Sequence, residues 1–377
     1  MKFFHLADLH LGRLFFAASL LEDQQYILEQ VLDLADREKP DAVLIAGDVY
    51  DRSVPSAEAE SLFGSFLESL SQRGINVLVI SGNHDSARRL SYAAGLLKNS
   101  GVYIAGEFGP QPQKVDLEDQ YGPVRFHLLP FIKPVHVRVV FPEEEIHSYT
   151  DAVRSAISRM ELLPQGRNVL LAHQFVTGAQ LGDSEEVNVG GLDNVDGGVF
   201  SSFDYVALGH LHRPQDVGSE KLRYCGTPLK YSFSEENQEK SLTVVEMKEK
   251  GSLSVKTIPL RPLHEVRTMK GTYEELTARD YYKGTRTDDY LQAVLMDEED
   301  VPGAMQKMRL IYPNLLHLQY GGRENEMPME EEEGLDKRES PLELASSFYK
   351  KQSGKELSKA QEALLSGLVG KIWEEET

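Results

Sequence analysis

Side chains of the metal-binding kind gather in five short segments of this 377-residue sequence. The segments are Asp8-Leu9-His10, Gly47-Asp48-Val49-Tyr50-Asp51, Ser81-Gly82-Asn83-His84-Asp85, His173 and Gly209-His210-Leu211-His212. Each begins or ends at a short apolar run that is typical of a buried strand. Ligands of open α/β sheets bind at the carboxyl edge of the strands. We therefore expect the five segments to deliver oxygen and imidazole nitrogen to the same sheet edge.

Each segment is weak evidence by itself, because a lone aspartate or histidine at a strand end commonly has a structural or surface role. Gly47 permits a sharp turn that leaves Asp48 at the sheet edge. Asn83 offers a carbonyl oxygen to a metal, and the adjacent His84 can contact a phosphate oxygen or protonate a leaving group. Two histidines separated by one residue, at 210 and 212, project to the same side of an extended segment. The five segments together predict a site for two metal ions.

These residue types suit the cleavage of a phosphodiester, whose anionic oxygens repel nucleophiles. Two cations about 3.5–4 Å apart neutralise that charge, lower the pKa of a bridging water and orient an in-line attack. An ionised aspartate can bridge both ions, and Asp48 is the natural candidate. Carboxylate, amide and imidazole ligands without thiolate favour Mn²⁺, with Mg²⁺, Fe or Zn²⁺ as alternatives. The sequence thus predicts a metal-dependent phosphoesterase.

Strands alternate with helices over the first 260 residues, which indicates a layered α/β architecture. The predicted strands are residues 3–7, 42–46, 77–80, 102–105, 126–129, 169–172 and 205–208, followed by β-rich sequence at 222–224, 242–247 and 253–258. Residues 22–38 and 56–73 carry apolar stripes at helical spacing. The first stripe includes Tyr26, Ile27 and Val31, and the second includes Phe63 and Phe66.

The last third of the chain differs from the rest. Residues 264–321 predict a compact β-α-β-α-β unit, set off by prolines at 259 and 262. An acidic spacer follows, and residues 340–377 predict two amphipathic helices. Such helices either fold back on the body or dock on a partner.

Composition limits the compartment and the kind of partner. A formal net charge of −20 argues against a chain that binds nucleic acid tightly by itself, because phosphate neutralisation supplies much of that affinity. One cysteine, Cys225, excludes an internal disulfide and a cysteine-based zinc site. No apolar run approaches the roughly 20 residues of a membrane span, and polar residues interrupt any secretory signal. We expect a cytoplasmic, nucleoid-associated protein with no membrane contact.

In their order and residue types, the five segments resemble the calcineurin-like metallophosphoesterase superfamily. The motifs at 5–12, 46–51, 81–86 and 209–214 are similar to those of the SbcD family of exonuclease subunits, as are Tyr224-Cys225-Gly226-Thr227-Pro228-Leu229-Lys230-Tyr231-Ser232-Phe233-Ser234-Glu235 and the tail around Ser340-Pro341-Leu342-Glu343-Leu344. The resemblance implies a layered α-β-β-α core at residues 1–262 and a small α+β capping domain that touches DNA at 263–322. It also implies an acidic linker at 323–339 and a helical partner-binding tail at 340–377.

The same resemblance implies a role for each site residue. Asp8, His10, Asp48 and His212 would hold one metal ion, and Asp48, Asn83, His173 and His210 would hold the other. His84 would contact the scissile phosphate and assist the leaving group, oriented by Asp51.

The resemblance further implies a homodimer that binds an SbcC-type coiled-coil ATPase through its C-terminal helices. The resulting heterotetramer would act on DNA in repair, recombination and replication, as an exonuclease on double-stranded ends and an endonuclease on single-stranded or hairpin DNA. Two other functions stay open from the residues alone. One is a phosphatase or phosphodiesterase for small substrates, and the other is a scaffold for an ATPase without catalysis. An enzyme for small substrates would not need the second unit and the tail. A scaffold without catalysis would not need the complete ligand set.

Overall fold

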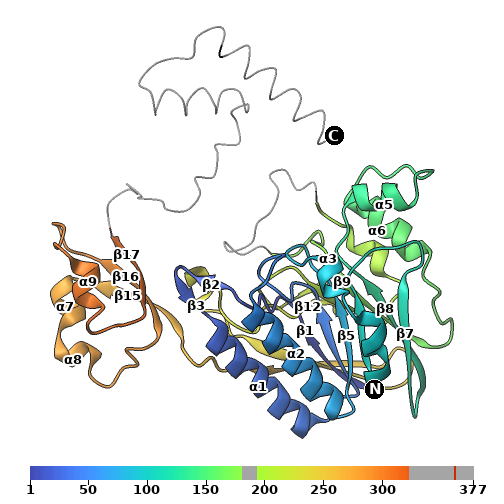
Figure 1. Ribbon diagram of the computed structural model, residues 1–377, viewed down its shortest axis with the longest axis horizontal. Helices are drawn as coiled ribbons and strands as arrows, with labels where there is room; N and C mark the ends of the chain where they lie inside the picture. The colour runs from blue at the N-terminus through green and yellow to red at the C-terminus, as the bar shows by residue number, and fades with distance from the viewer. Residues whose placement is uncertain (181–192, 322–360, 362–377) are drawn as a thin grey trace. The chain divides into compact units, whose positions relative to one another are not determined.

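The first six-stranded sheet is built around β1, and it carries three of the five predicted segments. The computed structural model describes residues 1–180, 193–321 and 361 (Figure 1). The order in this sheet is β14-β13-β1-β4-β5-β6. Strands β1, β4, β5 and β6 are parallel to one another, β13 is antiparallel to β1, and β14 is antiparallel to β13. Its strands are β1 (Lys2–Leu6), β4 (Ala42–Ala46), β5 (Asn76–Ile80), β6 (Val102–Ala105), β13 (Ser241–Met247) and β14 (Leu253–Pro259).

A second six-stranded sheet faces the first and carries the other two segments. Its order is β11-β12-β10-β9-β8-β7, with a parallel centre and one antiparallel strand at each edge. Its strands are β7 (Gln113–Asp119), β8 (Gly122–Leu129), β9 (Arg167–His173), β10 (Tyr205–Gly209), β11 (Gln215–Val217) and β12 (Ser219–Tyr224).

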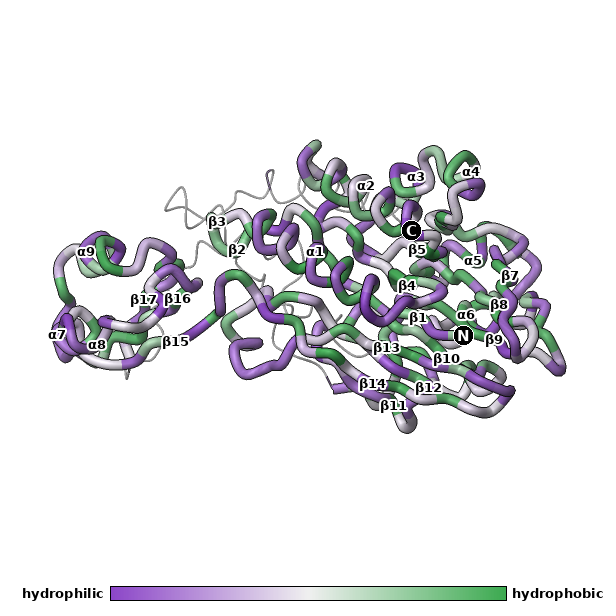
Figure 2. The backbone as a smooth tube through the Cα atoms, turned by 90° about the horizontal axis from the view of Figure 1, so that it is seen from below, coloured by the Kyte–Doolittle hydropathy of each residue, from purple (hydrophilic) through white to green (hydrophobic). Residues whose placement is uncertain are grey.

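Alternation of side chains along the strands creates the layers, because successive residues of a strand point to opposite faces of its sheet. Phe3 packs between the two sheets, where its ring meets Phe126 edge-on with centroids 5.6 Å apart. Phe4 and Leu6 face outward toward the helices. The strands at the centre of both sheets are accordingly rich in hydrophobic residues (Figure 2).

Helices cover the two outer faces, so the four layers run α-β-β-α as predicted. The first sheet is covered by α1 (Leu21–Glu38) and α2 (Ala57–Gln72). The second is covered by α5 (Pro134–Val140) and α6 (Tyr149–Ser158). The remaining short elements of the core are β2 (Leu14–Phe15), β3 (Ala18–Ser19), α3 (Ala87–Leu90), α4 (Ala94–Leu97), η1 (Lys98–Ser100), η2 (Gly197–Phe200) and η3 (Phe233–Glu235).

After β14, a three-stranded parallel sheet forms its own small hydrophobic core. It consists of β15 (Val266–Gly271), α7 (Tyr273–Thr277), α8 (Arg279–Tyr282), β16 (Tyr290–Leu295), α9 (Ala304–Met308) and β17 (Leu315–Tyr320). The buried carboxylate of Asp23 on α1 joins this unit to the larger core. It accepts hydrogen bonds from the backbone and ring of His264 and from the hydroxyl of Tyr290.

The predicted elements of the first 320 residues are confirmed with small changes at their ends, apart from details of two helices. Tyr26 was expected on the buried stripe of α1 but is 39% exposed, and the buried positions of that stripe continue through Leu28 instead. The last helix of the expected β-α-β-α-β unit is short and spans only Ala304–Met308. The spacer at 323–339 and the helices expected at 340–377 lie outside the described residues. Within the described part of the chain, no helix is long and apolar enough to cross a membrane.

Candidate metal centre

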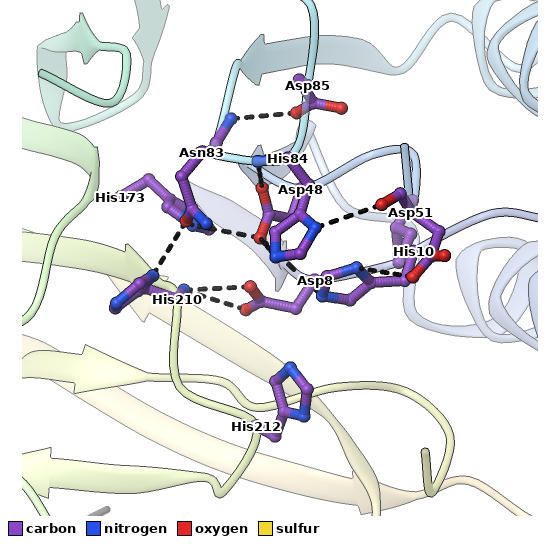
Figure 3. Close-up of polar contacts among 12 residues, drawn as sticks. Asp8, His10, Asp48, Asp51, Asn83, His84, Asp85, His173, His210 and His212 are labelled. Atoms are coloured by element: carbon purple, nitrogen blue, oxygen red, sulfur yellow. Dashed lines mark hydrogen bonds and ion pairs between the residues drawn. The ribbon is translucent and has the colours of Figure 1, made fainter. Parts of the chain in front are cut away.

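All nine predicted site residues converge at one place, where the carboxyl ends of the two sheets meet (Figure 3). Asp8 and His10 follow β1, Asp48 and Asp51 follow β4, and Asn83 and His84 follow β5; His173 ends β9, and His210 and His212 follow β10. One expectation was wrong: the segments do not share one sheet edge. Three come from the first sheet and two from the second, because strand order along the chain does not reveal where a second sheet begins.

The backbone at four of these positions is strained. Asp8, His10, Asp48 and His210 have φ angles of 54°, 44°, 48° and 104°. Residues other than glycine rarely adopt positive φ, and such strain concentrates at functional sites. The exit loops are thus bent so that the side chains turn back into the space between the sheets.

Glycines allow close packing at this point, between the two sheets at Gly209 and between neighbouring loops of the first sheet at Gly82. A Cβ on Gly209 would lie 2.0 Å from the carbonyl oxygen of Ala46, and one on Gly82 would lie 2.0 Å from Oδ1 of Asp48. Neither position has room for any other residue. The ends of β4, β5 and β10 therefore pack backbone against backbone around the site.

Asp48 lies at the centre of the cluster and is almost fully buried. Its Oδ2 is 3.4 Å from Nε2 of His173, 3.7 Å from Nε2 of His10 and 4.0 Å from Nε2 of His84. Two groups of candidate metal-binding atoms share this carboxylate, one with His10 and His84 and the other with Asp8 and His173. A single carboxylate common to two groups is the arrangement that can bridge two ions.

Asn83 links two of the three histidines contributed by the second sheet. Its Oδ1 lies 3.0 Å from Nε2 of His173 and 3.0 Å from Nδ1 of His210. The backbone N–H of His210 also donates to both carboxylate oxygens of Asp8, at 3.0 and 3.1 Å. Residues from both sheets thus surround a common point with oxygen and nitrogen donors.

His10 supplies the observation that best fits a metal. Its ring is 1% exposed, yet neither ring nitrogen has a hydrogen-bond partner among the described residues. The nearest carboxylate oxygens, on Asp51 and Asp48, are 3.6 and 3.7 Å away, which is too long for a hydrogen bond. Buried polar atoms are almost always satisfied. A cation that coordinates one of these nitrogens would remove the deficit.

The charges of the cluster suit metal binding as well. Burial lowers the pKa of His10 to about 4 and that of His210 to about 3, so both rings are neutral at pH 7 and present lone pairs. Burial also lowers the pKa of His173, but the negative charge of Asp48 outweighs it and raises that pKa to about 9, so this ring must release a proton when its nitrogen binds a metal ion. Burial raises the pKa of Asp48, while the positive charge of His173 holds it well below its usual range. Asp48 is therefore ionised.

His84 is held in a different way from the one expected. Its Nδ1 lies 3.1 Å from the main-chain carbonyl oxygen of Asp51, not from the carboxylate. The carboxylate of Asp51 instead accepts a hydrogen bond from Arg13 at 2.9 Å and lies near His10. Asp51 thus contacts His84 through its main chain, and its side chain bonds Arg13 instead.

Comparisons with known proteins agree with this geometry. Residues 1–214 match the model of the calcineurin-like phosphoesterase family, and residues 259–353 match a domain described as the type 5 capsule protein repressor C-terminal domain. The SbcD subunit of the nuclease SbcCD from Staphylococcus epidermidis is 33% identical over 383 residues, covering 100% of each chain. The chain belongs to the calcineurin-like phosphoesterases, in the SbcD nuclease family. It is a metal-dependent hydrolase of phosphodiester bonds.

Two solved structures resemble this phosphoesterase more distantly. A dimetal phosphatase from Danio rerio aligns with 69% of this chain and 99% of its own, at 14% identity and a TM-score of 0.37. An archaeal phosphodiesterase aligns with 68% of this chain and 100% of its own, at 13% identity and a TM-score of 0.30. Scores this low support no conclusion about this chain.

The phosphoesterase site also contains supporting residues to which sequence reasoning gave no role. The Asp85 carboxylate accepts hydrogen bonds from the backbone of Val49, Tyr50 and Gly82, which ties two ligand loops together. Its place directly after Asn83-His84 was a usable signal. Gln24 on α1 bonds the backbone of the 9–12 loop through both ends of its amide. Nothing in the sequence around Gln24 indicates that contact.

Proposed function

We propose that this chain is a Mn²⁺-dependent DNA nuclease that degrades double-stranded ends as an exonuclease and cuts single-stranded or hairpin DNA as an endonuclease. The shared, buried carboxylate of Asp48 carries the proposal, because a carboxylate common to two ligand groups suits a two-ion phosphodiesterase. Similarity over the full length to a nuclease subunit supports DNA as the substrate.

We assign Asp8, His10, Asp48 and His212 to one ion and Asp48, Asn83, His173 and His210 to the other. The first set is supported by the rings of His10 and His212, whose centroids are 5.3 Å apart. The second is supported by the contacts that Asn83 makes with both of its histidines. Asp8 lies within reach of Asp48 and His173, and we place its carboxylate in the first set on the resemblance to the family.

When bound, the two ions neutralise phosphate charge and supply an activated water. His84 then has the geometry of an acid. Its Nδ1 faces a carbonyl oxygen, so this nitrogen carries a proton, and Nε2 points toward Asp48 and the partly open side of the site. From there a ring that is protonated at both nitrogens would contact the scissile phosphate, pass its Nε2 proton to the leaving oxygen and keep the proton on Nδ1. Asp48 fixes the loop that carries this ring by accepting the backbone N–H of His84 at 2.9 Å.

The other regions have proposed roles in binding DNA and a partner. Residues 263–322 would be a capping domain that touches DNA, and 340–377 would bind the coiled-coil base of an SbcC-type ATPase beyond the linker at 323–339. Two copies would form a homodimer within a heterotetramer. The net charge of −20 fits this division, since the partner would supply much of the attraction to DNA.

Cleavage of end-labelled double-stranded DNA tests the proposal, with Mn²⁺ or Mg²⁺ and with or without the cognate ATPase. We expect cleavage that needs metal and becomes dependent on ATP when the ATPase is present. His84→Ala should keep its metal but cut about 10²–10⁴-fold more slowly, whereas Asp48→Ala should lose metal. Hydrolysis of a chromogenic diester without any cleavage of DNA would instead identify an enzyme for small substrates, and metal binding without any hydrolysis would identify a scaffold.

A further inference from the structure

A buried ion pair lies directly behind His212. Glu235 in η3 is 0% exposed and Lys240 is 5% exposed, and Oε2 of the carboxylate is 2.6 Å from Nζ of the lysine. Removing two charges from water costs more than their attraction reliably returns, so such a pair is weak evidence of a stabilising role. A buried pair of this kind beside a candidate metal ligand calls for a role in that site.

The two residues of the pair contact His212 at its ring and at its main chain. The other oxygen of Glu235, Oε1, lies 3.2 Å from Nδ1 of the His212 ring. Lys240 donates from Nζ to the main-chain oxygen of His212 at 3.0 Å and to the hydroxyl of Thr227 at 2.8 Å. Ring and backbone of one candidate ligand are therefore fixed by the two ends of a single ion pair.

His173, another candidate ligand from the second sheet, is held in a similar way. Its Nδ1 lies 2.8 Å from the carbonyl oxygen of Ala46, while Nε2 faces Asp48 and Asn83. In both rings Nδ1 faces an oxygen acceptor. The acceptor of His173 is a neutral carbonyl, whereas that of His212 is a carboxylate, which accepts a stronger hydrogen bond.

We propose that Glu235 is a positioning residue of the metal centre, which accepts the Nδ1–H of His212 and so directs the Nε2 lone pair at the ion shared with His10. Lys240 balances the charge of Glu235 and anchors the backbone of His212. The inference rests on the proposed role of His212 as a ligand. Carboxylates behind metal-bound histidines fix the tautomer and raise ligand basicity, and their loss weakens metal binding by about 10–100-fold.

Calorimetric titration with Mn²⁺ tests this on the full-length protein, for wild type, Glu235→Gln and Glu235→Ala. We expect two sites in the wild type, and in each variant one site weakened by about 10–100-fold with the other unchanged. The double variant Glu235→Gln/Lys240→Met leaves no unpaired buried charge, so it keeps the test valid if a single variant does not fold. Nitrogen-15 spectra of the metal-free protein should show His212 protonated at Nδ1 in the wild type and as a mixture of tautomers in Glu235→Ala.

Asp23→Asn is the matched control. Asp23 is likewise buried and bonds the ring of a histidine, His264, but that histidine is not among the proposed ligands. This variant should leave both Mn²⁺ affinities and the His212 tautomer unchanged. Glu235 variants that bind both ions as tightly as wild type would overturn the positioning role. A wild-type protein that binds no Mn²⁺ would instead overturn the metal centre itself, so the two failures are distinguishable.

Discussion

Replacing Gly82 by alanine should damage the metal centre without removing any of its ligands. A Cβ at this position would lie 2.0 Å from Oδ1 of Asp48 and 2.4 Å from the Asp48 backbone nitrogen, whereas Cβ contacts under 3.0 Å essentially never occur. To restore a contact of 3.0 Å, the carboxylate oxygen, now 2.0 Å from the added Cβ, must move by about 1 Å. A misplacement of about 1 Å in a catalytic site costs on the order of 100-fold in rate, which corresponds to about 2.7 kcal/mol of activation free energy.

The assay is kcat/KM for a chromogenic phosphodiester with saturating Mn²⁺, measured beside the melting temperature. Overpacking of this kind also destabilises by about 1–3 kcal/mol, so activity is compared well below the melting point. Gly64→Ala is the control, because a Cβ there meets nothing within 4 Å on the surface of α2. It should stabilise the helix by up to about 1 kcal/mol and leave activity unchanged. A folded Gly82→Ala protein with wild-type activity would refute the claim that this packing positions Asp48.

Three further outcomes are expected. Asp51→Ala should slow hydrolysis less than His84→Ala does, because the contact to His84 comes from the main chain; kcat for both variants decides this. Burial raises the pKa of Asp119, but hydrogen bonds from Arg167 and the terminal ammonium hold it well below its ordinary value of 3.8. The ionised Asp119 carboxylate therefore stabilises the fold above pH 3.8, and this contribution is lost on acidification. In urea titrations, Asp119→Asn should lower the free energy of unfolding by about 3 kcal/mol at pH 7. The loss should become progressively smaller below pH 3.8. Chelation should lower the melting temperature, and Mn²⁺ at 100 times its Kd should restore about 2.7 kcal/mol per site.

Strands that are buried on both faces were predictable from sequence because they are continuous apolar runs. The bounds of β4 and β6 match the predicted ranges residue for residue. β7 escaped prediction because it is an edge strand whose exposed charged residues, such as Lys114 and Asp116, hide the apolar alternation. Division of the strands between two sheets was also hidden, since it depends on pairing between segments far apart in the chain.

For the metal centre, residue types and spacing identified the groups that converge, but not how they are held. A carbonyl oxygen exists at every residue, so no pattern could assign the Asp51 main chain to His84. Glu235 lies 23 residues from His212 on a separate turn, and only the fold brings them together. Supporting contacts of this kind depend on the tertiary structure, whereas the types and spacing of the ligand residues are visible in the local sequence.

The split of the proposed ligands over two sheets has a consequence for how the chain acquires its metal during synthesis. The ligands extend from Asp8 to His212, and β1, which presents the first of them, gains its second neighbour only when β13 (Ser241–Met247) has emerged from the ribosome. A nascent chain that ends before β9 would carry Asp8, Asp48 and Asn83 yet lack every histidine of the second sheet. Because the last of the proposed ligands is His212, the metal centre cannot be complete before that residue has been made, and a product truncated ahead of it would lack the proposed site.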